Sequence, residues 1–165
     1  MPYILESYFE NTQDIPVSLG ATNLRMGDWL VVATLNLERP AMFTWNFCSL
    51  QILSSSVNFN DISASNYVNG NLGLVYLILR KDYTGGLPEA TGALDIVTAT
   101  GKGIFNRNLA NKLVVTEPGS YSWIIVNNMK VSSAENPRIP VTASIDFIVA
   151  VTGAARYTLW PKNSP

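Results

Sequence analysis

The side chains that most often carry catalysis are scarce in this sequence of 165 residues. It contains no histidine, which excludes a Ser-His-Asp triad, a Cys-His pair and a histidine-based zinc site. The single cysteine, Cys48, lies in an apolar run over 43–53, so we expect a small buried hydrophobe. No base is available to make it a thiolate, and no second cysteine to make a disulfide.

Paired carboxylates are the remaining enzymatic route, as in glycoside hydrolases. The glutamates all fall in the N-terminal segment, in expected loops or at strand ends: Glu6, Glu10, Glu38, Glu89, Glu117 and Glu135. Asp146 alone is expected in mid-strand, and its alternation phase points it outward. No Asp-rich loop has calcium spacing, and Gly101-Lys102-Gly103 lacks the flanking residues of a phosphate loop. The sequence therefore predicts a non-enzymatic protein with no catalytic, cofactor or metal site.

Sugar binding without catalysis is the main alternative, because lectin-like sandwiches use loop aromatics together with Asn and Asp. Trp160 is one exposed aromatic candidate, and a possible ligand loop comprises Asn66, Tyr67, Asn69 and Tyr83. These residues also have an ordinary interpretation. Loop aromatics pin loops to a core, and Asn supplies left-handed backbone and local hydrogen bonds.

Composition limits the possible partners. Charged residues make up 14% of the chain, hydrophobic residues 47%, and the net charge is -1. Without basic clusters nucleic-acid binding is not expected, and the longest apolar stretch, 141–155, is broken by Asp146 and too short to span a membrane. The acidic N-terminus does not resemble a signal peptide, so we expect synthesis in a cytoplasm. So little charge implies a neutral polar surface, burial against other subunits, or both.

The sequence predicts two parts: an N-terminal arm, residues 1–13, and a β-sandwich domain, residues 14–165. Its apolar side chains lie outside any strong strand pattern and are the expected interface residues: Tyr3, Ile4, Leu5, Tyr8 and Phe9. The arm could pack on its own domain or on a neighbouring subunit.

The rest of the chain alternates with a period of two and is punctuated by turn residues. Strands are expected at 15–19, 29–37, 42–53, 72–80, 94–98, 113–116, 121–126, 141–152 and 155–160. A change of phase within 42–53 indicates a bulge or burial on both faces, and Asn69-Gly70 indicates a hairpin turn. Helix is limited to a turn near 106–112. These features predict one all-β sandwich of about eight to nine strands, jelly-roll-like.

The alternation also predicts which side chains form the core. The expected core residues are Trp29, Val31, Phe43, Trp45, Leu74, Tyr76, Ile78, Trp123, Ile125, Ile145, Phe147 and Val149. In the last long strand, Val141 shares the inward phase of Ile145 and Phe147.

The segment 113–123, LVVTEPGSYSW, joins a strand, a Pro-Gly turn and a Tyr-x-aromatic strand. It resembles the late hairpin of many jelly rolls, and the whole chain resembles phage capsid decoration (cement) proteins in type. That resemblance implies a virion component, a homo-oligomer such as a trimer, and a major capsid or other virion protein as partner. It transfers no functional residue to this chain.

Overall fold

The computed structural model describes residues 12–106, 113–115, 117–131 and 138–160, and these residues form an all-β structure. They contain ten strands, two 3-10 turns and no α-helix. The strands are β1 (Thr12–Pro16), β2 (Leu19–Leu24), β3 (Trp29–Leu37), β4 (Ala41–Ser55), β5 (Val75–Lys81), β6 (Asp95–Ala99), β7 (Gly103–Asn106), β8 (Leu113–Val115), β9 (Gly119–Asn127) and β10 (Phe147–Leu159). The 3-10 turns are η1 (Phe59–Asp61) and η2 (Ala64–Asn66).

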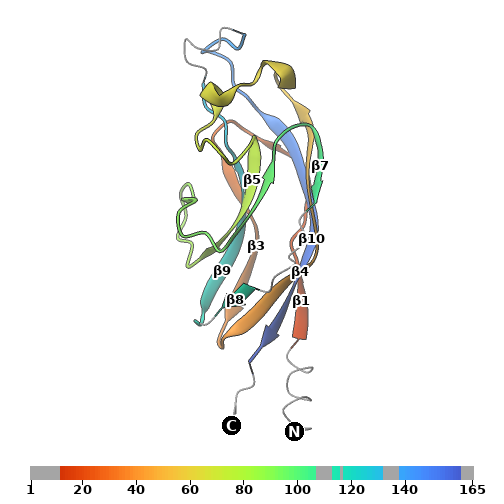
Figure 1. Ribbon diagram of the computed structural model, residues 1–165, viewed down its shortest axis with the longest axis vertical. Helices are drawn as coiled ribbons and strands as arrows, with labels where there is room; N and C mark the ends of the chain where they lie inside the picture. The colour runs from red at the N-terminus through yellow and green to blue at the C-terminus, as the bar shows by residue number, and fades with distance from the viewer. Residues whose placement is uncertain (1–11, 107–112, 116, 132–137, 161–165) are drawn as a thin grey trace.

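The strands form two antiparallel sheets that face each other (Figure 1). Sheet A has the order β1-β10-β4-β7, with β2 also paired to β10 and β8 to β4; sheet B has the order β3-β9-β5-β6. Since β1 and β2 pair with successive parts of β10, they share one strand position, and β7 and β8 likewise share one beside β4. The result is the double-sheet jelly roll that the sequence predicts.

The main core lies between the sheets and is rich in aromatic rings. Phe43 of β4 lies at its aromatic centre, with ring centroids of Tyr121, Trp123 and Tyr157 at 6.0 to 6.1 Å. Phe147 of β10 stacks on Phe59 of η1 at 6.0 Å. Tilted and edge-to-face pairs of this kind add to the stabilisation from burial alone. The buried thiol of Cys48 belongs to this core, as predicted.

A second, smaller core lies on the outer side of sheet B. It is built from outward-facing residues of β5 and β9, Tyr76, Ile78, Ile124 and Val126, all of them buried. The segment 82–94 covers them, with Tyr83 and Ala93 packed against the cluster, and Figure 1 shows this segment beside sheet B, away from sheet A. Strand β5 is therefore buried on both faces, as its continuous apolar sequence predicts.

Two of the expected core residues are not fully buried, although Trp29 packs against the second core. Trp29 is only partly buried, and Val31 is 43% exposed. Both belong to β3, which is an edge strand of sheet B, and its register with β9 shifts between Val31 and Ala33. Val31 pairs with Ile124 and so lies on the outer side of the sheet, at an edge that the segment 82–94 does not bury. The prediction for Val31 was wrong because alternation does not identify an edge.

The change of phase within β4 comes from bulges, and burial on both faces is not observed. The register with β10 shifts between the pairs Ala154–Phe47 and Ala155–Trp45, so Asn46 has no direct partner. The bulge puts Phe47 on the outer face, 51% exposed, although it shares the sequence phase of Phe43 and Trp45.

Strand β10 is continuous over thirteen residues, whereas the sequence predicted two strands separated by a turn at Gly153. Gly153 lies within the strand, where an added Cβ would lie 3.0 Å from the Phe47 carbonyl oxygen and 3.2 Å from that of Val17. The glycine thus permits close approach of neighbouring backbone. Residues 141–146 precede the strand, so the expected inward position of Val141 was wrong, and its side chain is 60% exposed.

Three further expectations concern turns and boundaries. Asn69-Gly70 forms no hairpin, because it lies in the crossover from β4 of sheet A to β5 of sheet B. The helical turn expected near 106–112 falls almost wholly outside the described residues. Of the arm, residues 12 and 13 belong to β1 and pair with β10, while residues 1–11, which include Tyr3, Ile4, Leu5, Tyr8 and Phe9, lie outside the described residues.

Candidate functional site

The residues of the possible ligand loop lie in two separate segments. Asn66 ends η2 and Tyr67 follows it, whereas Tyr83 lies beyond β5. Asn66 is fully buried: its side chain accepts a hydrogen bond from the Ser63 N–H at 3.1 Å and donates to the Lys130 carbonyl at 3.4 Å. The Tyr67 backbone bridges to Met129, and its ring packs on the main core. These contacts hold the loop on the sandwich.

Asn69 is held by Asn128, a residue that the sequence analysis did not single out. The Asn128 side chain accepts from the Asn69 N–H at 2.9 Å and donates to the Asn69 and Gly73 carbonyls at 2.9 and 2.8 Å. Its neighbour Asn127 donates to the Leu24 and Ile145 carbonyls at 2.9 and 3.0 Å. The signal was present in the sequence, since two adjacent Asn residues, Asn127 and Asn128, stand at the end of a strand buried on both faces.

Tyr83 pins its own loop, because its hydroxyl donates to the Gly86 carbonyl and its ring packs on the second core. Asn69 reaches the same core from another direction, with its side-chain N–H 3.5 Å from the Tyr76 hydroxyl. Burial raises the pKa of Tyr76, so this hydroxyl is a neutral hydrogen-bonding group. The loop Asn and Tyr residues are thus engaged in holding loops to the sandwich.

Two clefts in the described part of the chain are small. One is lined by Asn69, Tyr76 and Leu87 among others. The other opens between the sheets beside Trp45, whose indole N–H donates to the Asp95 carboxylate at 2.9 Å. Each has a volume of about 10 Å³, which is room for about one water molecule, so neither of these two clefts encloses a small-molecule ligand.

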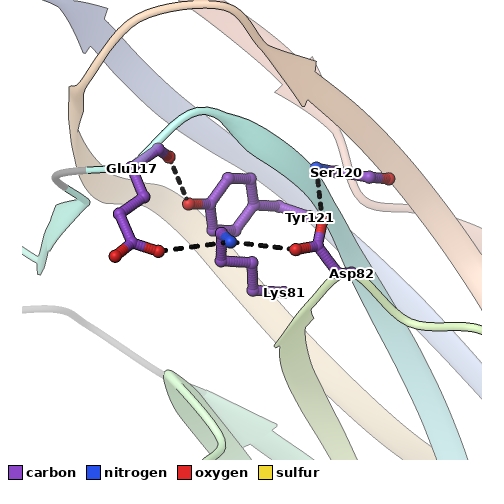
Figure 2. Close-up of polar contacts among 5 residues, drawn as sticks. All are labelled: Lys81, Asp82, Glu117, Ser120 and Tyr121. Carbon is purple, nitrogen blue, oxygen red and sulfur yellow. Dashed lines mark hydrogen bonds and ion pairs between the residues drawn. The ribbon is translucent and has the colours of Figure 1, made fainter.

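A charged cluster joins the end of β5 to the start of β9, at the Pro-Gly turn that the sequence singled out (Figure 2). The Lys81 ammonium lies 2.9 Å from the Asp82 carboxylate and 3.3 Å from that of Glu117. Asp82 also accepts from the Ser120 N–H at 3.1 Å, and the Tyr121 hydroxyl donates to the Glu117 carbonyl at 2.6 Å. Figure 2 shows the Lys81 nitrogen between the two carboxylates.

Hydrogen bonds within this cluster shift the pKa values of Lys81 and Asp82 towards their charged forms. Hydrogen bonds from Lys81 to Asp82 and then to Glu117 raise the pKa of Lys81, so its amine is held protonated and is a poor nucleophile. The same bond to Lys81, with a smaller contribution from the Ser120 N–H, lowers the pKa of Asp82. An added Cβ at Gly119 would lie 2.9 Å from the Lys81 side chain, which would have to move aside.

The other carboxylates considered for chemistry are dispersed. Asp146, just before β10, accepts from the Met26 N–H at 2.9 Å and from the Ser144 hydroxyl at 2.6 Å, so it ties loops together. Glu38 is exposed immediately after β3. Within the described ranges, no group of three or more His, Cys, Asp or Glu residues could hold a metal ion. The described residues also contain no helix long and apolar enough to cross a membrane.

The outer face of sheet A exposes several large apolar side chains. Its outer apolar patch consists of side chains that are 39 to 61% exposed: Phe47, Leu53, Ile104 and Ile148. Gln51 of β4 pairs with Ile104 of β7 and with Ala150 of β10, so Leu53, Ile104 and Ile148 gather on three neighbouring strands. Phe47 lies at the level of Ala154, on the other side of the hydrogen bond from the Ser49 hydroxyl to Asn106. On sheet B the corresponding outward residues are covered by the segment 82–94, but no described segment covers the patch on sheet A (Figure 1).

Comparison with known proteins places the fold. No family model and no curated protein matches the sequence. A solved chain from infectious bursal disease virus, Gx strain, aligns with 93% of this chain at a TM-score of 0.50 and 12% identity. The likeness is one of fold. A mutant VP2 protein of that virus, in T=1 particles, aligns at a TM-score of 0.36 and 11% identity. This chain spans 33% and 41% of the lengths of those two chains.

Proposed function

We propose that this chain is a non-enzymatic structural subunit of a virus particle, in the specific form of a phage capsid decoration (cement) protein. It assembles as a homo-oligomer, a trimer in the simplest case, and binds the major capsid protein or another virion protein. The observation that carries the proposal is the outer apolar patch on sheet A. The segment 82–94 of the same chain packs on the outer face of sheet B, whereas the outer face of sheet A is open to another subunit.

The small charge content supports the same proposal. Strands β4, β7 and β10 contain no carboxylate, and their single charged residue is Arg156, which pairs with Asp14 at 2.8 Å. Interfaces are depleted in charge at their centres, because each unpaired charge loses its hydration there. A face of this composition is suited to burial between protein subunits. The solved viral chain supports the proposal only through the shared fold.

Sedimentation velocity of the full chain tests the assembly. The wild-type protein is expected to sediment as an oligomer, and the double substitution Phe47→Ser with Ile104→Ser is expected to shift it towards the monomer. Val141→Ser is the matched control, because Val141 is 60% exposed but lies before β10, outside the patch. A wild-type protein that remains monomeric over the whole concentration range would refute the assembly role.

Co-sedimentation with virus particles tests the decoration role. The full chain is mixed with capsids from the source that encodes it and pelleted. Binding that saturates at a fixed number of chains per capsid supports the proposal, and wild-type protein that stays in the supernatant contradicts it. The patch variant distinguishes the partner: if sheet A binds other copies of this chain, the variant still pellets with capsids but as a monomer, and if sheet A binds the capsid, the variant remains an oligomer but no longer pellets.

A further inference from the structure

We infer that residues 1–11 of one copy of this chain cover the outer apolar patch on sheet A of a second copy. The inference rests on the proposed assembly role and names the occupant of the exposed face. It follows from the composition of the patch, from the direction in which β1 enters the sheet, and from the sequence that precedes β1.

The patch and the N-terminal segment match in chemistry. The patch offers four large aliphatic or aromatic side chains on or beside β4, β7 and β10, three strands that contain no carboxylate, and the exposed Lys102 directly precedes β7, which contributes Ile104. Residues 1–11 bring Tyr3, Ile4, Leu5, Tyr8 and Phe9 together with two acids, Glu6 and Glu10. An apolar segment with negative charge therefore meets an apolar face whose border is positive.

Length permits the contact. Eleven extended residues reach roughly 36–40 Å at about 3.3–3.6 Å per residue. Thr12 pairs with Thr158, Phe47 lies at the level of Ala154, and Leu53 lies beside Ile148. The patch thus extends over about six residues along β10, from the level of Ala154 to that of Ile148, or roughly 20 Å at the spacing of a strand. The segment is long enough to lie along the whole patch.

Direction favours a second copy over the same one. Strand β1 runs from the level of Thr158 towards that of Ala154, and the patch lies further along this direction. The chain before Thr12 therefore approaches from the end opposite the patch. Covering its own patch would require the chain to reverse its direction before Thr12, where Asn11 is a turn-forming residue and residues 3–10 contain neither Gly nor Pro. A neighbouring copy can receive the segment without a reversal.

Thiol cross-linking of the full chain tests this exchange. One variant carries Ser7→Cys, among the apolar residues of the segment, and another carries Gln51→Cys, between Ile104 and Ala150 on the patch. Mixing the two with a short bismaleimide is expected to give a covalent dimer containing one chain of each kind. Wild-type protein controls for the buried Cys48, and Val141→Cys replaces Gln51→Cys as a control that should give no dimer.

A double variant, Ser7→Cys with Gln51→Cys in one chain, is diluted into excess wild-type protein and treated in the same way. A product cross-linked within one chain would overturn the inference in favour of packing on the same copy. An oligomer that gives neither product would also overturn it, while leaving the assembly role intact. Protein that is monomeric by sedimentation would overturn both.

Substitution within the segment gives a second, independent readout. Tyr8→Ser with Phe9→Ser is expected to raise the dissociation constant of the oligomer at least about tenfold, since two buried rings are lost. Combined with Phe47→Ser and Ile104→Ser, it should add little, because both pairs of substitutions remove the same contact. Full additivity would mean that the segment and the patch bind different surfaces and would contradict the inference.

Discussion

At the residue scale, we expect one phenylalanine, Phe147, to contribute to the stability of the sandwich and another, Phe47, to contribute to its association. Phe147 is fully buried and stacks on Phe59, whereas Phe47 is 51% exposed on the outer face of sheet A. Phe147→Ala is expected to lower the free energy of unfolding by roughly 3–5 kcal/mol, the range for large aromatic truncations in cores. Urea denaturation monitored by tryptophan fluorescence measures it.

Phe47→Ala serves as the matched control for that measurement. It removes the same atoms from a site that is half in water, so the unfolding free energy of the monomer should change by less than about 1 kcal/mol. The two variants should therefore separate clearly, with Phe47→Ala affecting association more than folding. Equal losses in the two variants would mean that Phe47 is packed in the monomer.

The charged cluster at Lys81 predicts that the stability of the fold depends on pH. The hydrogen bond from Lys81 to Asp82, and secondarily that from the Ser120 N–H, lowers the pKa of Asp82 below its usual value of 3.8. A lowered pKa in the folded state means that the carboxylate stabilises the fold above its unfolded pKa, and this contribution is lost as the pH falls through the folded pKa. Asp82→Asn should therefore be less stable than wild type at neutral pH and equally stable well below pH 3.8.

Urea midpoints at a series of pH values measure this difference. Asn is a suitable replacement because Asp82 has a φ of 52°, a left-handed conformation that Asn tolerates, and because its amide oxygen can still accept from Ser120. In a Lys81→Met background the same substitution should have a smaller effect at neutral pH. An unchanged effect in that background would assign the stabilisation to the Ser120 hydrogen bond instead.

Single residues were predictable where burial follows alternation. Trp123, Ile125, Phe147 and Val149 lie in the core as their phase predicts, because one inward face repeats every second residue. The structural roles of Asn127 and Asn128 were not predictable in detail. Each binds carbonyls that come from distant parts of the chain, and the identity of such partners depends on tertiary structure alone.

At the element scale, the continuity of β10 depends on a glycine. Gly153→Val is expected to destabilise the protein by roughly 1–3 kcal/mol, as overpacking does, because its side chain would press on the Phe47 and Val17 carbonyls. Gly20→Val in β2 is the control, since an added Cβ there meets nothing within 4 Å. Thermal unfolding compares the two, and a Gly153→Val protein as stable as the control would mean that the neighbouring backbone shifts freely.

The strands themselves were largely predictable, but some of their limits were not. Alternation and apolar runs located β3, β4, β5 and β9, since these signals are local. The turn expected at Gly153 was wrong because a glycine required for close backbone approach looks, in sequence, like a glycine required for a turn. The separation of 12–24 into β1 and β2 likewise depends on their pairing with different parts of β10.

At the scale of the whole molecule, the sequence predicts the fold but not the surface that we propose for assembly. An even spacing of strands without helical periodicity is sufficient to predict a sandwich, and the two sheets confirm it. The exposed patch on sheet A was not predictable, because it requires knowing that β4, β7 and β10 are neighbours and that a bulge turns Phe47 outward. The sequence indicated buried surface between subunits through its low charge and through the apolar side chains of residues 1–13, but not through this face.

Truncation at the N-terminus distinguishes the segment that we assign to assembly from the strand that belongs to the fold. Deleting residues 1–11 removes no described strand, so the fold should be retained, and any loss of thermal stability should depend on protein concentration. Deleting residues 1–16 also removes β1, together with the bond from the Tyr157 hydroxyl to Gln13 at 2.7 Å and the Arg156–Asp14 ion pair.

The longer truncation leaves the last part of β10 as an unpaired edge, which invites association with other strands. It should therefore unfold at a lower temperature at every concentration and aggregate on standing, whereas the shorter truncation should stay soluble and sediment as a smaller species. Circular dichroism melts at two or more protein concentrations, paired with sedimentation velocity, measure both effects. A shorter truncation that fails to fold would make residues 1–11 part of the sandwich itself, because a segment that acts only between subunits cannot be required by an isolated chain.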